Sequence, residues 1–355
     1  MPRALKDVLK RAYESMGLAT LRLASKHGVL ASFYYFLINR SFDREHLATI
    51  HGLLNYQQNL YQLKASSALL RRNIHRLEKG LIMTPRRPSF AEHFIVETVD
   101  IFTKAHQQQS IDSKEFQWAY NVLSEYFTIV VDTPVIAKAR VAFEVINSQI
   151  DTQQSTDCDL LTPYKYADLP APQVNPEQLA TLFARRRSVR WYDDKPVPHE
   201  LLAQAVNMAS TAPSACNRQP YRFDVATDPE RARAIAKLAG GTPGWVQNVQ
   251  CCAVVVGDLS SYFGEHDRHL IYIDGSLAAM QFMLALDTLG LASCPVNWPD
   301  VDSREKNLQA ELNLPPYERP IMLITVGYPS QDGGVAFSQK KQSTSLLNIV
   351  NGNKS

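Results

Sequence analysis

The sequence predicts an α+β fold, in which helices wrap a sheet, preceded by an all-helical N-terminal domain. Apolar residues over 42–150 recur at helical spacing, whereas residues 176–350 alternate short apolar β-type runs with helical segments. A segment rich in Gln, Ser, Thr, Asp and Pro separates the two patterns. Since 355 residues exceed the usual size of one domain, we expect a helical domain over 1–150, a linker over 151–175 and a second domain over 176–355.

Composition argues against several classes of protein. The chain has 37 Lys and Arg against 35 Asp and Glu, and a net charge of +2 gives no overall electrostatic reason to bind nucleic acid. The five cysteines form no C-x-x-C pair and no zinc spacing, and their odd number argues against a disulfide framework, so we expect a reducing, cytoplasmic location. No run reaches the roughly eighteen apolar residues of a membrane-spanning helix. Glu265, His266 and His269 lack a fourth ligand, and we expect no metal.

The N-terminal segment is basic. Apolar residues over 1–26 recur every three to four positions, which predicts an amphipathic helix. Residues 1–40 carry seven Lys and Arg against two Asp and Glu, a local charge of +5. Two interpretations stay open: contact with an anionic membrane surface, or packing on the protein's own domain, which is the more common use of such helices.

The stretch 69–81 is the most informative part of the helical domain. One helical face carries only apolar side chains, which predicts burial of Leu70, Ile74, Leu77 and Leu81. The cationic residues are Arg72, His75, Arg76 and Lys79, with Arg71, Arg86 and Arg87 close by. Because like charges at i and i+4 repel, the stretch is either a solvated basic face or a binding site for an anionic group of a substrate or partner.

The second domain begins with a strong helix-start signal. Asn175 suits the N-cap, Pro176 suits the first helical position, and Gln178 lies three residues after the cap. Apolar patterns then predict helices over 176–187, 199–211, 229–239, 274–289 and 302–312, and strands over 221–227, 251–257, 293–297 and 321–327.

Two polar segments of this domain point to a bound cofactor. Residues 185–192 place four arginines in six positions with a serine among them, and their repulsion calls for an anion. Residues 212–220 combine proline, serine, asparagine and glutamine, which supply a rigid turn and short hydrogen-bonding groups. Together they suggest a clamp for a phosphorylated cofactor. The alternative for the first segment is a helix end enriched in arginine because cations suit that end of the helix dipole.

In this order and spacing, the two segments resemble the opening of the FMN-dependent nitroreductase family. The resemblance covers about residues 176–350 and continues through the sequences of 290–294 and 325–329. It implies a nitroreductase-like mixed sheet wrapped by helices, bound FMN, NAD(P)H as a transient reductant, and a homodimer that shares its flavin sites.

The resemblance also assigns roles to residues of the arginine segment and the turn. Arg186 would bind the FMN phosphate, and Arg187 and Ser188 would reach the phosphate and ribityl region. Arg190 would approach the pyrimidine edge, where a cation stabilises the reduced flavin. The partner subunit's half of the clamp would consist of Pro213, Ser214, Asn217 and Gln219.

Two further groups complete the expected flavin site. Backbone N–H groups near flavin N5 would come from Cys294, Pro295 and Val296. Lys340 and Lys341 would approach the phosphate, although a glutamine follows them where the family often has an arginine. No side chain is expected to act as a catalytic group, because hydride moves at flavin N5.

The expected function is therefore an oxidoreductase in which NAD(P)H reduces FMN and a small-molecule acceptor then takes the electrons. An anionic acceptor would suit the basic residues of 69–81. Two alternatives stay open: a non-catalytic flavin-binding or regulatory module, and a specialised relative such as a reductive dehalogenase or a flavin-fragmenting enzyme. The stretch 72–81 also resembles helical extensions fused to nitroreductase domains in bacterial surface-polysaccharide pathways, which defines no substrate.

Overall fold

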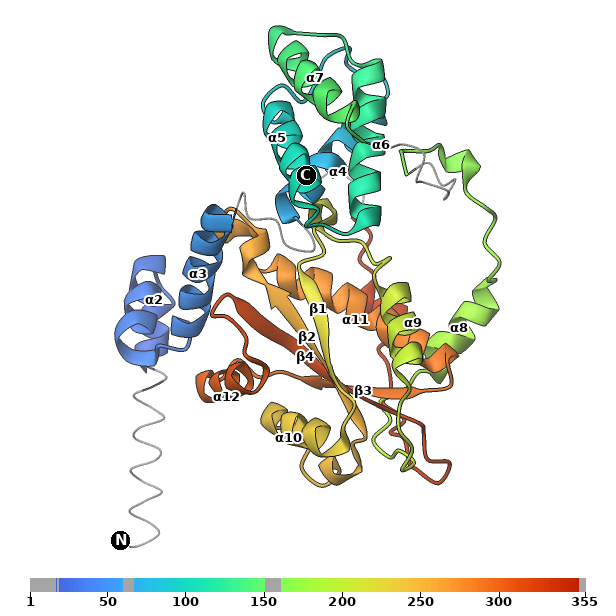
Figure 1. Ribbon diagram of the computed structural model, residues 1–355. Helices are drawn as coiled ribbons and strands as arrows, with labels where there is room; N and C mark the ends of the chain where they lie inside the picture. Colours follow the sequence, from blue (N-terminus) through green and yellow to red (C-terminus); the bar gives the residue numbers. More distant parts are fainter. Residues whose placement is uncertain (1–16, 18, 60–66, 151–160, 351–355) are drawn as a thin grey trace, which may run out of the picture.

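The computed structural model describes residues 17, 19–59, 67–150 and 161–350. A helical unit lies at one end of the molecule, and a four-stranded sheet covered by helices lies at the other (Figure 1). The N-terminal elements are α2 (Gly28–Tyr34), the π-helix η1 (Tyr35–Asn39), α3 (Asp43–Asn59), α4 (Ala68–Leu81), α5 (Ile95–Gln108), α6 (Ser113–Ile129) and α7 (Pro134–Asn147). The amphipathic helix predicted at the N-terminus falls mostly on residues outside the described ranges.

The remaining elements belong to the second part of the chain. Its helices are η3 (Tyr166–Asp168), α8 (Pro176–Arg185), α9 (His199–Ala209), η4 (Ala215–Asn217), α10 (Pro229–Ala239), η5 (Val246–Asn248), η6 (Leu259–Ser261), η7 (Glu265–Asp267), α11 (Leu270–Thr288), α12 (Asp302–Leu312) and α13 (Ser343–Leu346). Its strands are β1 (Tyr221–Ala226), β2 (Cys251–Asp258), β3 (Ala292–Asn297) and β4 (Glu318–Gly327).

Helices α4 to α7 form a unit with its own hydrophobic core. Ser67, Asp112 and Thr133 cap α4, α6 and α7, because their side-chain oxygens accept backbone N–H groups of the first turn. The four residues of the predicted apolar stripe of α4 are at most 5% exposed, so their predicted burial is confirmed. No strand occurs in the described residues before 150, as the helical pattern predicted.

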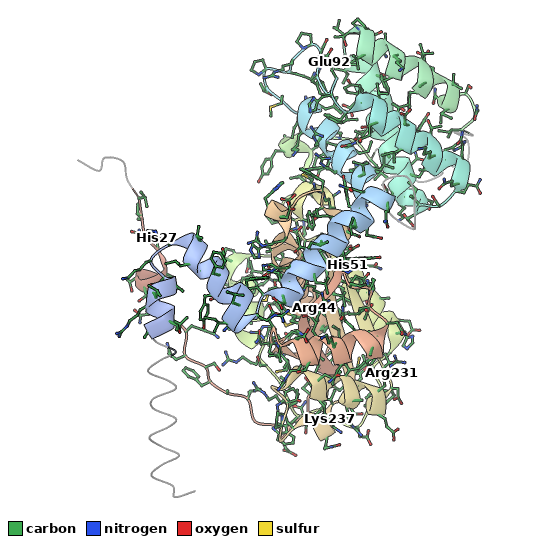
Figure 2. The ribbon with its side chains drawn as sticks, turned by 90° about the vertical axis from the view of Figure 1, so that its left-hand side faces the viewer. His27, Arg44, His51, Glu92, Arg231 and Lys237 are labelled. Atoms are coloured by element: carbon green, nitrogen blue, oxygen red, sulfur yellow. The ribbon has the colours of Figure 1, made fainter. Side chains whose placement is uncertain are left out.

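Helix α3 does not join this core and packs instead against the sheet-containing part. Ala48 is buried among side chains of η6 and α11, and Arg44 Nη1 donates to the Pro316 carbonyl oxygen over 2.9 Å. In Figure 2, Arg44 and His51 mark α3, and Glu92 marks the helical unit above it. The N-terminal helices are therefore divided between two cores, and the domain boundaries stay a prediction.

The sheet has the strand order β1-β2-β4-β3, and every neighbouring pair is antiparallel. The central strands β2 and β4 are buried almost throughout, as expected for strands covered on both faces. The parallel pairing found in the described part is the isolated bridge between Ser188 and Ser293. The predicted α+β fold is confirmed, and the mixed character of its sheet is limited to this bridge.

Two helical layers cover the sheet (Figure 1). Helices α9 and α11 pack on one face, where Ala279 and Phe282 are fully buried, and α10 and α12 cover the other through Ile235 and Leu308. The helical stretch 265–288 is long and apolar enough to cross a membrane. Half of its most apolar window is buried inside the protein, and α11 contributes Ala279 and Phe282 to the core on one face of the sheet.

Candidate functional site

The arginine-serine segment lies along the start of β3. Beside the bridge between Ser188 and Ser293, Val189 N donates to the Ser293 carbonyl oxygen over 3.1 Å. Tyr192, which is 4% exposed, anchors the segment from inside: its Oη donates to the Val189 carbonyl oxygen over 2.6 Å and lies 2.8 Å from Thr325 Oγ1. Main-chain pairing and one buried tyrosine therefore fix the segment without using the arginine side chains.

Two of these arginines keep unused hydrogen-bonding capacity. Arg186 Nε is buried and has no hydrogen-bond partner, and Arg190 Nη1 makes one long bond, 3.4 Å, to the Ser188 carbonyl oxygen. The Arg190 guanidinium lies 5.8 Å from the centre of the Trp245 ring, and the ion pairs of the described residues include neither arginine. Burial raises the pKa of Cys294, and Arg190, a hydrogen bond with Ser188, and Arg186 oppose that shift. The positive charges of Arg186 and Arg190 are therefore both felt at Cys294, near the start of β3.

Arg187 is used differently from its neighbours. Its Nη2 donates to the carbonyl oxygens of Ala336, over 2.6 Å, and of Phe337. These bonds tie the C-terminal segment to the arginine segment. Lys340 and Lys341 follow a few residues later and are exposed.

The second polar segment forms a strained turn around η4. Cys216, Asn217 and Gln219 have φ values of 54°, 52° and 50°, and this left-handed conformation costs a non-glycine residue of order 1–3 kcal/mol. Ser214 Oγ accepts the Gln219 N–H over 3.1 Å, and Asn217 Oδ1 lies 3.3 Å from Gln219 Nε2. Pro213 is exposed at the start of the turn. Side-chain hydrogen bonds thus join Ser214, Asn217 and Gln219 across a turn in which three of the four residues 216–219 have positive φ.

Within one chain, the two halves of the predicted clamp lie at opposite ends of the sheet. The turn enters β1 at Tyr221, which is level with Gly257 of β2 and, through it, with Arg319 of β4. The arginine segment pairs with Ser293, which is level with Val326 of β4. Residues 319 and 326 are seven positions apart, roughly 23 Å at about 3.3 Å per residue. One chain therefore does not close both halves on a single ligand.

Residues 183–255 and 244–328 match the model of the Nitroreductase family. The C-terminal half is a nitroreductase-family domain. An FMN reductase (NAD(P)H) of Bacillus subtilis is 30% identical over 159 residues, which are 41% of this chain and only 63% of that protein. The predicted family is confirmed, and the FMN and NAD(P)H that name this relative agree with the expected oxidoreductase class and cofactors.

Other relatives cover a similar share of the chain. An iodotyrosine deiodinase of Haliscomenobacter hydrossis is 25% identical over 218 residues, which are 49% of this chain and 93% of that protein. A solved FMN-dependent nitroreductase from Clostridium difficile is 22% identical, covers 49% of this chain and 99% of its own, and has a TM-score of 0.42.

The arginine segment of the nitroreductase-family domain fits the phosphate of FMN. The unsatisfied Nε of Arg186 and the hydroxyl of Ser188 are the donor types that phosphate oxygens require. Arg190 offers a cation without an ion pair in the described part, as the charge of a reduced flavin requires. Which side chains contact FMN stays a prediction.

One expected backbone contact is corrected on chemical grounds. Proline has no N–H, so Pro295 cannot present one to flavin N5. Its place on the edge strand β3 explains why the missing donor is tolerated there. Cys294 and Val296 keep their N–H groups and stay candidates.

The basic residues of α4 do not act as one face. His75 Nδ1 lies 3.1 Å from a carboxylate oxygen of Glu78, and Lys79 is exposed. Arg72 and Arg76 are half-buried and lie over aromatic rings. The predicted set of four therefore divides: Arg72 lies over Phe263 of the sheet-containing part, whereas Arg76 lies over Phe94 of the helical unit, with its Nη2 2.7 Å from His93 Nε2.

Other residues shape the site without having been assigned a role from the sequence. Trp245 lies beside Arg190, and Asn248 Nδ2 donates to the Arg190 carbonyl oxygen over 2.7 Å. At the turn, Arg71 Nε of α4 donates to the Asn217 carbonyl oxygen over 2.8 Å. These contacts join residues far apart in the chain, so no local motif could have indicated them.

Proposed function

We propose that the protein is an FMN-dependent oxidoreductase that passes electrons from NAD(P)H to a small-molecule acceptor. The observation that carries the proposal is the buried Nε of Arg186, which lacks a hydrogen-bond partner in a nitroreductase-family domain. A buried donor without an acceptor costs about 1–3 kcal/mol, and a phosphate oxygen would remove that cost. FMN, when bound, supplies the reversible uptake of hydride.

The residues of the chain position and polarise the cofactor rather than react. Arg186 and Ser188 hold the phosphate end, and Arg190 provides the fixed positive charge that favours the reduced, anionic cofactor. Trp245 limits the movement of the Arg190 guanidinium. Burial raises the pKa of Cys294, so this thiol stays protonated and is not a nucleophile.

The proposed working unit is a homodimer in a reducing compartment such as the cytoplasm. The separation of the two clamp halves within one chain supports this part of the proposal, because Asn217 of the partner subunit would complete the site begun by Arg186. Mixing Arg186→Ala chains with Asn217→Ala chains tests it. An isolated heterodimer should recover one intact site, about half the FMN of the unaltered dimer, and no recovery would refute the shared site.

Cofactor analysis tests the proposal as a whole. The purified protein should carry FMN, identified by mass spectrometry of the released cofactor. Under anaerobic conditions NADH or NADPH should bleach the flavin absorbance, and a quinone should restore it. Absence of bound flavin after incubation with excess FMN would refute the proposal. Bound flavin that neither reductant bleaches would favour the non-catalytic module.

A second candidate function is reductive dehalogenation. The match over 93% of the length of an iodotyrosine deiodinase supports it. In this reaction two electrons from the reduced flavin and one proton replace a carbon–halogen bond by a carbon–hydrogen bond, and halide leaves. Halide release from an iodinated tyrosine by the reduced protein, measured with a halide electrode, distinguishes this function from quinone reduction alone.

A further inference from the structure

Three arginines from two parts of the chain gather beside the turn around η4. Arg72 and Arg76 belong to α4, and Arg218 belongs to the turn. Each guanidinium carbon lies over an aromatic ring: Arg72 is 4.8 Å from the centre of Phe263, Arg76 is 3.8 Å from that of Phe94, and Arg218 is 5.1 Å from that of Tyr262. Cation–π contact leaves the N–H groups at the guanidinium edges available for hydrogen bonds. Arg76 Nη2 lies 2.7 Å from His93 Nε2, and Arg218 Nη1 donates to the Ala215 carbonyl oxygen over 3.4 Å, so a ligand would use the remaining N–H groups.

The three cations share one electrostatic neighbourhood. Burial lowers the pKa of Arg76, and the charges of Arg72 and Arg218 lower it further, while Cys216 and Glu97 oppose the shift. Burial also raises the pKa of the Tyr56 hydroxyl, and both Arg72 and Arg218 act against that change. The positive charges therefore repel one another at this place, and an anion bound there would relieve the repulsion.

The carboxylates nearby have other partners. Glu115 pairs with Arg71 over 2.9 Å, Glu97 accepts from Asn73 Nδ2 over 3.0 Å, and Asp274 accepts the Ala215 N–H over 2.9 Å. Asp274 and Arg218 still attract each other at longer range. In the described part of the chain, no carboxylate forms an ion pair with any of the three arginines.

A cavity of about 300 Å³ adjoins Arg218. Residues of both parts of the chain line it, including Tyr56 from α3 and Gln219 and Tyr221 from the region of the turn. Tyr221, another lining residue, has a buried Oη without a hydrogen-bond partner. The volume lies at the lower end of the range of small-molecule sites.

We propose that Arg72, Arg76 and Arg218 bind the oxyanion group, a carboxylate or a phosphate, of the electron acceptor. This inference rests on the proposed function, since the cluster adjoins the turn that would form half of the flavin clamp. Guanidinium groups match oxyanions by paired N–H donors, and three of them can contact more than one oxygen of such a group. Lys79 and His75, on other parts of α4, take no part.

Two quinones that differ by one anionic group test the kinetic consequence. Neutral 1,4-naphthoquinone and its 2-sulfonate each take a hydride from the reduced flavin and a proton from water. Because the sulfonate also withdraws electrons from the ring, variants are compared by the ratio of the two kcat/KM values, in which this difference cancels. For FMN-loaded wild-type protein, kcat/KM should favour the sulfonate. The Arg72→Gln, Arg76→Gln double variant should lower the sulfonate-to-neutral ratio about ten- to a hundredfold, the value of a charged hydrogen bond. Lys237→Gln, an exposed charge on α10, should leave the ratio unchanged.

A binding measurement reports on the cluster independently of turnover. Pyrophosphate should bind FMN-loaded wild-type protein in calorimetry, weaken with added salt, and lose affinity in the double variant. If neither quinone is reduced by the wild type, the proposed function fails while calorimetry still tests the cluster. An unchanged ratio together with unchanged pyrophosphate binding overturns the inference. Where the double variant does not fold, Arg72→Gln alone should show the same direction of change, and an equal loss for both quinones would make the cluster structural.

Discussion

The two arginine-rich regions of the molecule are positioned by different forces. The segment of Arg186 and Arg190 is fixed by its own backbone, through the pairing of residues 188 and 189 with β3 and through Tyr192. Arg72 and Arg76 belong to helix α4, and contacts with the rings of two phenylalanines position their side chains.

This difference determines which substitutions should disturb the structure of each region and which should affect only its contacts with a ligand. A backbone-held segment keeps its place when any one arginine is changed, so such a change removes only that side chain's contacts. A region positioned by side chains depends on the docking of two parts of the chain, and here Arg71 connects α4 to the turn. Variants should therefore separate loss of binding from loss of structure.

The largest effect is expected where the docking itself is broken. Arg71→Met removes the ion pair with Glu115, whose side chain is 5% exposed, and the hydrogen bond to the Asn217 carbonyl. Because Glu115 keeps the Ser67 N–H as a donor over 3.1 Å, the loss should lie at the lower end of the about 3–5 kcal/mol that breaking a buried ion pair costs. Chemical denaturation should show a loss near 3 kcal/mol in the free energy of unfolding, whereas Lys79→Met on the exposed side of α4 should change it by less than about 0.5 kcal/mol.

A smaller effect is expected in the backbone-held segment. Arg186→Ala should weaken FMN by about 1.5–3 kcal/mol, ten- to a hundredfold in Kd, without changing the melting temperature of the apoprotein beyond a few degrees. Arg185→Ala is the matched control, because its side chain is 64% exposed and pairs with Asp287 on the surface. Equal FMN affinity for both variants would remove Arg186 from the phosphate site.

Loss of the Tyr192 hydroxyl, which anchors that segment, should lower the free energy of unfolding by about the contribution of one hydrogen bond. Tyr192→Phe keeps the ring but removes the bonds to the Val189 carbonyl and Thr325. We expect a loss of about 1 kcal/mol in stability and a modest rise in the Kd for FMN. A variant as stable as the wild type would mean that backbone pairing alone holds the segment.

The smallest effect is expected in the rates at which the cysteines react with an alkylating reagent. Burial raises the pKa of Cys251 to about 12, so its thiol stays protonated below that pH, and Cys252 is equally buried. Cys216 is half-buried in the turn. Iodoacetamide at pH 8 should label Cys216 well before Cys251 or Cys252, and added FMN should slow it, as peptide mass spectrometry can show. Fast labelling of Cys251 would contradict the described packing of β2.

Much of the second domain could be predicted from local signals. The helix over 229–239 has the predicted bounds because Asp228 caps its start and Gly240, with φ of 78°, ends it. β4 begins three residues earlier than expected, at Glu318. Charged residues such as Glu318 and Arg319 are typical of exposed loops. Both are buried here because Glu318 pairs with Arg222 and Arg319 pairs with Glu305.

The site was less accessible to sequence reasoning. The arginine segment and the turn could be found because each is a short run of residues with related chemistry. The contact of Arg72 and Arg76 with the region of Arg218 could not, because about 140 positions separate them and only tertiary packing joins them. His75 and Lys79 share the helical spacing of those arginines, and spacing alone did not reveal that one pairs with Glu78 and the other faces solvent.

The bond from Arg71 to the Asn217 carbonyl has a thermodynamic consequence. A ligand that binds the turn in its strained conformation also stabilises the contacts that hold this conformation, such as the bond from Arg71. By linkage, these contacts favour binding of the ligand by the same free energy. The amide protons of α4 and α6, which Arg71 joins through Glu115, should therefore exchange more slowly when a ligand occupies the turn. A fraction of the folding energy of the helical unit would then be part of the dissociation constant of that ligand.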